Sequence, residues 1–268
     1  MSIQYKGWKF EFDHLPSAEE LEDRYQERVA RLSNRAVVLG AEQGALSGTF
    51  PLSPMQRWFF AQPLQTPEYW NHGIVYPAPS GPTAEHWCEA WEEMLRRHDA
   101  LRLRFQCTDG EWEQSYSALL DAESFESLDF REEPDPNQKL TEYLTRLHRE
   151  INLEGGIARF AFVLLPDGPD KLVIVVHHLA ISGFCWPILA ADLLDAAATL
   201  SKGDAIESPD KGTSLRYWAS ELASTEASPE SLQYWLDGPW DRASFGLPKD
   251  REGSGVEGNV AVARLKVP

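Results

Sequence analysis

A chain of 268 residues, 43% of them hydrophobic and 11% aromatic, can bury a large core, so it is not a disordered segment. Its 42 acidic and 25 basic residues leave a net charge of -17, which makes nucleic acid and anionic membranes poor candidate partners. Three cysteines lack the spacing of a disulfide framework or a zinc site, and the first residues lack the apolar stretch of a signal peptide. We therefore expect a cytoplasmic protein.

Residues 1–46 are expected to form a small N-terminal unit. In "GWKFEF" aromatic residues alternate at the period of a β-strand, and "SAEELEDRYQERVARL" combines capping-box spacing with one apolar helical face. The polar stretch "LGAEQGALSG" that follows is expected to be a linker. Two interpretations of the unit remain open: a docking element for another protein, or an extension that packs on its own domain.

Beyond this unit the pattern alternates between helices and strands. Thr83 is placed to cap a helix that ends at Arg97, and the sequence "ALRLRFQC" after it is expected to be extended. Asp135 is placed to cap a second helix, with Pro136 in its first turn and leucines along one face. Both helices are therefore expected to bury one side.

Two strands are expected next, in "ARFAFVLLP" and "KLVIVV". The second is apolar at every position after its lysine, which is typical of a strand buried on both faces. It is therefore expected to be a central strand of a sheet that helices cover. The rest of the chain is expected to form three helices, in "WPILAADLLDAAATL", "TSLRYWASELA" and "SPESLQYWL", and a strand in "GNVAVARLKVP".

Two adjacent histidines, His177 and His178, end the predicted central strand. Neighbouring residues of a strand point to opposite faces, so the two imidazoles enter different environments. Strand ends of α/β sheets border the crevice where ligands bind, and a neutral imidazole exchanges protons near neutral pH. We expect one ring to hold the turn and the other to act as a base, although both could be ordinary strand-end residues. A metal site is not expected, because no third ligand is spaced to join them.

Three segments carry a further pattern, in this order: "PLSPMQRWFFAQ" at 51–62, "RRHDALRLRF" at 96–105 and "HHLAISGFCW" at 177–186. Together they resemble the opening motifs of the condensation superfamily of nonribosomal peptide synthetases. The likeness is greatest to the epimerization branch, and it rests on Gln56, Trp58, Phe59 and Phe60 in the first segment, on Trp186 after the histidines and on the later stretches "RYWASELA" and "SPESLQYW". The resemblance covers about residues 47–268 and implies an α/β (α+β) sandwich with a mixed sheet covered by helices. This would be the amino-terminal chloramphenicol-acetyltransferase-like lobe and the start of the crossover to a second lobe.

Epimerization domains of this superfamily invert the α-carbon of an aminoacyl or peptidyl thioester, which a peptidyl carrier protein presents on its 4'-phosphopantetheine arm. The resemblance implies that His178 is the catalytic histidine and that His177 supports its loop. The arm would enter a tunnel between two lobes, and the chain would bind no cofactor of its own. The tunnel candidates are Gln56, Trp58, Cys185 and Trp186.

The sequence departs from the family pattern at two points. It lacks the "EGHGRE"-like stretch that supplies the family's catalytic glutamate, so we expect it to need a complementary carboxyl-terminal lobe or self-association. Ser182, before Gly183, replaces an aspartate that ties the histidine loop to a basic side chain, for which Arg102 is the candidate. Serine offers only a neutral hydrogen bond, so the loop is expected to be looser.

Two other functions remain open. A carrier-binding scaffold without catalysis fits the serine substitution and the missing glutamate. A condensation or acyltransferase domain would use the same histidine to position an amine nucleophile. The preserved histidine doublet favours an enzyme over the scaffold.

Overall fold

The computed structural model describes residues 2–5, 8–11, 40–118 and 122–238. These residues divide into two compact units, with the boundary between Ser224 and Thr225. The first unit contains both sheets of the predicted domain, and the second contains helix α7 (Pro229–Leu236), which Ser228 caps. In the part of the chain that is described, no helix is both long and apolar enough to cross a membrane.

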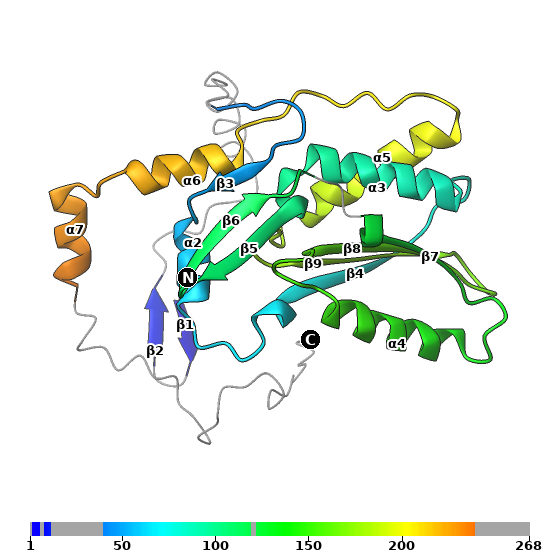
Figure 1. The fold of residues 1–268 in the computed structure, drawn as a ribbon. Coiled ribbons are helices and arrows are strands. Elements are labelled where there is room, and N and C mark those ends of the chain that lie inside the picture. The colour runs from blue at the N-terminus through cyan, green and yellow to red at the C-terminus, as the bar shows by residue number, and fades with distance from the viewer. Residues whose placement is uncertain (1, 6–7, 12–39, 119–121, 239–268) are drawn as a thin grey trace. The chain divides into compact units, whose positions relative to one another are not determined.

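A four-stranded mixed sheet with the order β4-β9-β8-β7 forms the centre of the first unit (Figure 1). Strand β9 pairs antiparallel with both β4 and β8, whereas β7 pairs parallel with β8. All residues of β9 after its lysine are buried, which confirms the prediction of a central strand. The strands are β4 (Asn71–Pro77), β7 (Phe125–Asp129), β8 (Ala158–Leu164) and β9 (Lys171–His177).

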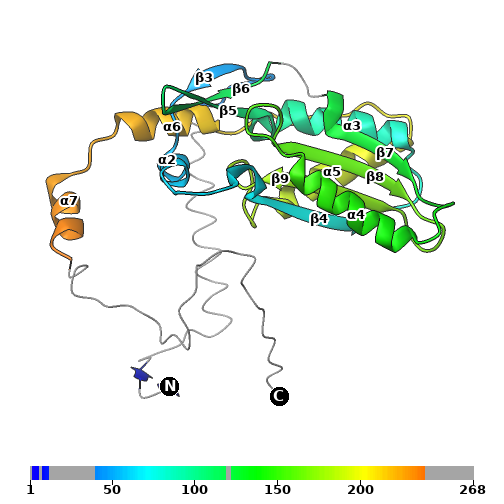
Figure 2. The ribbon, with the colours of Figure 1, turned by 60° about the horizontal axis from the view of Figure 1, so that its bottom comes forward.

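Helices cover both faces of this sheet. Helices α3 (Ala84–Arg97) and α5 (Trp186–Ser201) pack on one face and form the largest core with its side chains. Helix α4 (Pro136–Arg149) covers the other face, and in Figure 2 it lies in front of the strands while α5 lies behind them. Both rows of side chains on the central strands therefore meet apolar partners.

The predicted caps of the two long helices are confirmed. The side chain of Thr83 accepts a hydrogen bond from the backbone of α3, and that of Asp135 accepts one from the backbone of α4. The apolar faces are buried as expected, with Trp87 and Trp91 in the first core and Leu147 in the core under α4.

The first unit also contains a smaller antiparallel sheet with the order β3-β6-β5, which has a hydrophobic core of its own. Helix α6 (Leu215–Ser224) runs alongside β3 and packs Ala219 into the core of this sheet (Figure 1 and Figure 2). The segment expected to be extended at "ALRLRFQC" instead begins with a 3-10 turn, because the backbone N–H of Leu101 donates to the carbonyl oxygen of His98 at 2.9 Å and closes a turn there. The elements are β3 (Gly48–Phe50), η2 (Asp99–Arg102), β5 (Leu103–Thr108) and β6 (Glu111–Tyr116).

The remaining described elements are short. β2 confirms the strand expected in "GWKFEF", and it pairs antiparallel with β1, which was not predicted. The helix expected in "SAEELEDRYQERVARL" and the strand expected in "GNVAVARLKVP" lie outside the described residues. The elements are β1 (Ser2–Tyr5), β2 (Trp8–Glu11), α2 (Pro54–Phe60), η1 (Pro67–Tyr69) and η3 (Ala122–Ser124).

Candidate active site

The histidine doublet lies at the carboxyl end of the central strand, as predicted. His177 is the last residue of β9 and is fully buried, whereas His178 begins the following turn and is exposed. The two rings therefore enter different environments, as the alternation of strand side chains requires.

His177 holds the turn through both of its ring nitrogens. Nε2 lies 2.9 Å from the carbonyl oxygen of Pro67, which can only accept, so Nε2 carries the proton. Nδ1 accepts a hydrogen bond of 3.1 Å from the backbone N–H of Leu179. Burial lowers the pKa of His177, and the charge of His178 lowers it further, although the bond to Pro67 partly opposes them. His177 is therefore a neutral structural residue with no free nitrogen.

His178 has the opposite tautomer. Its Nδ1 lies 2.7 Å from the carbonyl oxygen of Ile181, so Nδ1 donates and the neutral ring keeps its lone pair on Nε2. Its backbone N–H donates to the carbonyl oxygen of Trp70 at 2.9 Å, which continues the pairing of β9 with β4 by one residue. The described residues supply no hydrogen-bond partner for Nε2. An exposed imidazole with a fixed Nδ1–H and an unused Nε2 can act as a general base.

His72 on β4 lies against His178, a contact that was not predicted. The two ring centroids are 4.2 Å apart and the ring planes are inclined by 48°. Burial lowers the pKa of His72, and the charge of His178 lowers it further. No local signal in the sequence indicated this contact, because it depends on the register between two strands that are distant in the chain.

Asn71 and His148 support the opposite face of the same strand. Asn71 Nδ2 donates to the carbonyl oxygens of His148, at 2.9 Å, and of Glu68, at 3.0 Å. The ring of His148 donates from Nδ1 to Asn71 Oδ1. A Cβ atom on Gly73 would lie 2.7 Å from His148 Nε2, so glycine is required for this approach of α4 to β4. These residues were also not predicted.

The loop after the doublet is held by short-range contacts. Ser182 Oγ lies 3.3 Å from Cys185 Sγ, and the backbone N–H of Cys185 donates to the carbonyl oxygen of Ser182 at 3.0 Å. Gly183 has open space around it, since none of the described atoms lies within 4 Å of the position that a Cβ atom would take. Ser182 therefore bonds within its own loop.

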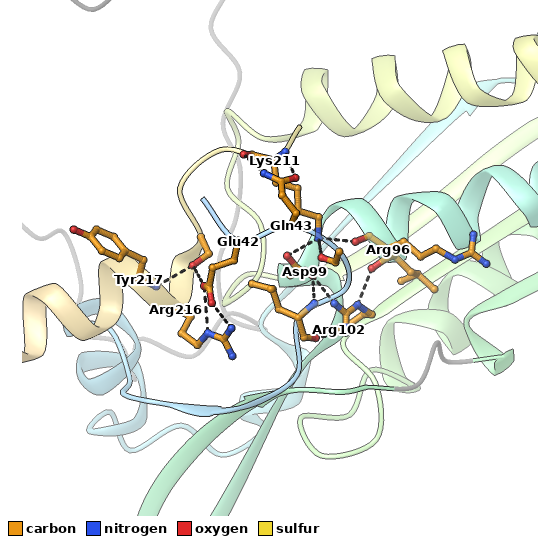
Figure 3. Close-up of polar contacts among 12 residues, drawn as sticks. Glu42, Gln43, Arg96, Asp99, Arg102, Lys211, Arg216 and Tyr217 are labelled. Atoms are coloured by element: carbon orange, nitrogen blue, oxygen red, sulfur yellow. Dashed lines mark hydrogen bonds and ion pairs between the residues drawn. The ribbon is translucent and has the colours of Figure 1, made fainter. Parts of the chain in front are cut away.

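Arg102 was predicted to be the basic partner of this loop, and that prediction is wrong. Its side chain is 2% exposed and pairs with Asp99, three residues before it in η2 (Figure 3). Its guanidinium also donates to the carbonyl oxygens of Leu95, Leu46 and Ser117. Among the described residues, none of its polar partners belongs to the histidine loop, because a carboxylate in the adjacent turn satisfies the buried charge locally.

The segment expected to be a linker takes part in the same network (Figure 3). Its residues 40–46 are irregular, as predicted, but Leu46 is buried and Glu42 pairs with Arg216 of α6. Lys211 Nζ donates to the carbonyl oxygen of Gly44 at 2.6 Å and to Asp99 Oδ2 at 2.8 Å. The described part of this stretch is therefore packed and not a free linker.

The four tunnel candidates have different surroundings. Gln56 is buried, accepts from the backbone of Ser53 and donates to Gln114, so it caps α2 and joins it to β6. Trp186 is the first residue of α5 and is buried in the largest core. Trp58, which is 54% exposed, and the half-buried Cys185 are the two that remain accessible.

A family model described as "Condensation domain" matches residues 46–260. The chain belongs to the condensation-domain family.

In the described ranges no group of three His, Cys, Asp or Glu side chains is placed to hold a metal ion.

The condensation-domain relatives include large peptide synthetases. Tyrocidine synthase 1 of Brevibacillus parabrevis is 30% identical over 79% of this chain and 20% of its own length. Surfactin synthase subunit 2 of Bacillus subtilis (strain 168) is 30% identical over 93% of this chain and 7% of its own length. The chain therefore spans a small part of these curated relatives and is a condensation-superfamily domain of the kind found in nonribosomal peptide synthetases.

Two solved structures show the same fold. The epimerization domain from the third module of tyrocidine synthetase B has a TM-score of 0.72 and 27% identity, over 80% of this chain and 49% of that chain. The starter condensation domain of rhizomide synthetase has a TM-score of 0.62 and 19% identity, over 74% of this chain and 49% of that chain. The predicted fold of one lobe is confirmed, and the chain spans about half the length of each solved domain.

Proposed function

We propose that this chain provides the histidine-bearing lobe of an epimerization domain. Its substrate would be an aminoacyl or peptidyl thioester on the 4'-phosphopantetheine arm of a peptidyl carrier protein, and the reaction would invert the α-carbon. The observation that supports this most directly is the exposed ring of His178, whose Nδ1–H is fixed by Ile181 and whose Nε2 has no partner among the described residues. The likeness to an epimerization domain of tyrocidine synthetase B supports the choice of branch.

The chemistry requires one base and one acid. Nε2 of His178 takes the α-proton, the C–H electron pair moves into the thioester group, and the carbonyl oxygen carries the negative charge of the enolate. Return of a proton to the opposite face of the α-carbon completes inversion. His178 occupies one face only, so the proposal requires an acid from a second lobe on the other face. His177 keeps the turn in place and takes no part in proton transfer.

Deuterium incorporation at the α-carbon tests this proposal. An aminoacyl thioester on a peptidyl carrier protein is incubated in deuterated buffer with the chain alone, and with the chain plus the carboxyl-terminal lobe of an epimerization domain. We expect exchange when the lobe is present and a fall of about 10²–10⁴-fold in His178→Gln. His86→Gln is the matched control, since glutamine at that position keeps the capping box of α3.

Two other results would each replace the proposal by another function. Binding of the carrier protein without any exchange above background, with or without the second lobe, would identify a scaffold. Formation of a peptide bond or another acyl-transfer product from a donor and an acceptor substrate would identify a condensation or acyltransferase domain, in agreement with the matching family model.

A further inference from the structure

We propose that His72 is a positioning residue for His178. Its ring packs against the imidazole of His178 and holds that imidazole with Nε2 directed toward the substrate. This inference rests on the proposed function, because it assigns a task to a neighbour of the proposed base. The observation behind it is the contact between the two rings, whose centroids are 4.2 Å apart.

The contact follows from the backbone. His72 pairs with Val176 in the β4–β9 ladder, and the bond from His178 N–H to the carbonyl oxygen of Trp70 extends that ladder past the end of β9. His178 is therefore the diagonal cross-strand neighbour of His72 on the same face, a distance that aromatic side chains can bridge. The register therefore places the Cβ atoms of the two histidines on the same face, and the rotamers of both rings bring the rings into contact.

A single hydrogen bond does not fix the ring of His178. The bond from Nδ1 to the carbonyl oxygen of Ile181 sets one point of the ring and leaves its tilt free. The ring of His72 supplies the second restraint. Two restraints define the direction of Nε2, and a misplacement of about 1 Å at a reacting group can cost about 10²-fold in rate.

The position and the pKa of His72 suit a positioning residue better than a second acid. The two rings touch, so no α-carbon can lie between them, and His72 cannot deliver a proton to the face opposite His178. Burial and the charge of His178 lower the pKa of His72, which favours an uncharged ring beside the imidazolium that His178 becomes. A second cation at this place would oppose removal of the α-proton.

Two substitutions separate the positioning role from proton transfer. His72→Phe keeps a flat ring and removes both nitrogens, whereas His72→Ala removes the ring. Val75→Ala is the matched control, because Val75 is an exposed β4 residue on the other row. The measurements are the tautomer of His178 by ¹⁵N NMR of the chain itself, and kcat and KM for α-carbon exchange with the second lobe present.

We expect His72→Ala to lower kcat by about tenfold or more with little change in KM. A ring that is free to tilt weakens its bond from Nδ1 to the carbonyl oxygen of Ile181, so we also expect a shift of His178 away from the Nδ1–H tautomer. His72→Phe and Val75→Ala should retain both properties. A wild-type tautomer and kcat in His72→Ala would overturn the proposal, as would a His72→Phe variant as slow as the alanine variant. The tautomer is measured without turnover, so absence of exchange in every protein would reject the proposed function and still leave the restraint on His178 tested.

Discussion

The hydrogen bonds of the doublet assign different tasks to two identical side chains. Each ring lies near a carbonyl oxygen, which can only accept, and this fixes the ring proton on Nε2 of His177 and on Nδ1 of His178. His177 uses its second nitrogen to accept from Leu179, whereas Nε2 of His178 meets no donor or acceptor in the described parts of the chain. The residue with the unused nitrogen is also the exposed one, which is why it is the better candidate for a base.

Removal of the His178 ring should change the titration of its neighbour. The pKa of His72 is lowered first by burial and second by the charge of His178. In His178→Gln the second cause is absent, so we expect the pKa of His72 to rise toward its ordinary value. A pH titration of the His72 ring signals by NMR measures this. An unchanged pKa would mean that the two rings do not interact in solution.

Strand alternation made the different environments of the two rings predictable, because it is a local property of the chain. Alternation alone does not say which ring is exposed, and the choice of His178 came from the family resemblance. The roles of His72 and Arg102 were not predictable in this way. The contact of His72 depends on the β4–β9 register, and Arg102 pairs with the nearby carboxylate of Asp99 and not with a more distant partner.

At the scale of elements, the contact between β4 and α4 depends on one glycine. In Gly73→Ala the new Cβ would lie 2.7 Å from His148 Nε2 and 2.9 Å from its Cε1, so the ring must move and its bond with Asn71 is lost. We expect a loss of about 1–3 kcal/mol in the free energy of unfolding, measured by urea denaturation.

A double variant tests the physical cause of that loss. His148→Ala clears the space, so Gly73→Ala should cost less in that background than in the wild type. Gly212→Ala is the control, since none of the described atoms lies within 4 Å of the position of its Cβ. Equal costs in the two backgrounds would show that the clash with His148 is not the reason.

Regular elements were predicted where their signal was strong. Helices α3, α4 and α5 combine a cap or an early proline with a long periodic stretch, and β9 is a continuous apolar run. Strand β4 was missed because it is an edge strand, carries a glycine and ends in proline, and alternates weakly in burial. Of the two strands that position His178, β9 was therefore predicted and β4 was not.

For the whole molecule, several partly or fully buried histidines make stability depend on pH. Burial is the first cause of the lowered pKa of four of them: His72, His98, His148 and His177. Each pKa is lower in the folded state than in the unfolded state, so the unfolded chain binds more protons in acid. Their contribution to stability is complete above the ordinary pKa of about 6.5 and is lost as the pH falls through the folded values.

We therefore expect the free energy of unfolding to decrease between about pH 7 and pH 5, before most carboxylates titrate. Urea denaturation at a series of pH values measures this decrease. His177→Asn should show a smaller slope, because it lacks one of the groups that take up a proton on unfolding. A free energy that is constant or rises over this interval would contradict the prediction.

The opposed tautomers have a chemical consequence. An electrophile attacks an imidazole at the nitrogen whose electron pair is not already shared, and both nitrogens of His177 are bonded to the backbone. The doublet therefore presents one nucleophilic atom and not two, although its side chains are identical. Because the turn uses both ring nitrogens of His177, His178 is the more reactive histidine of the two.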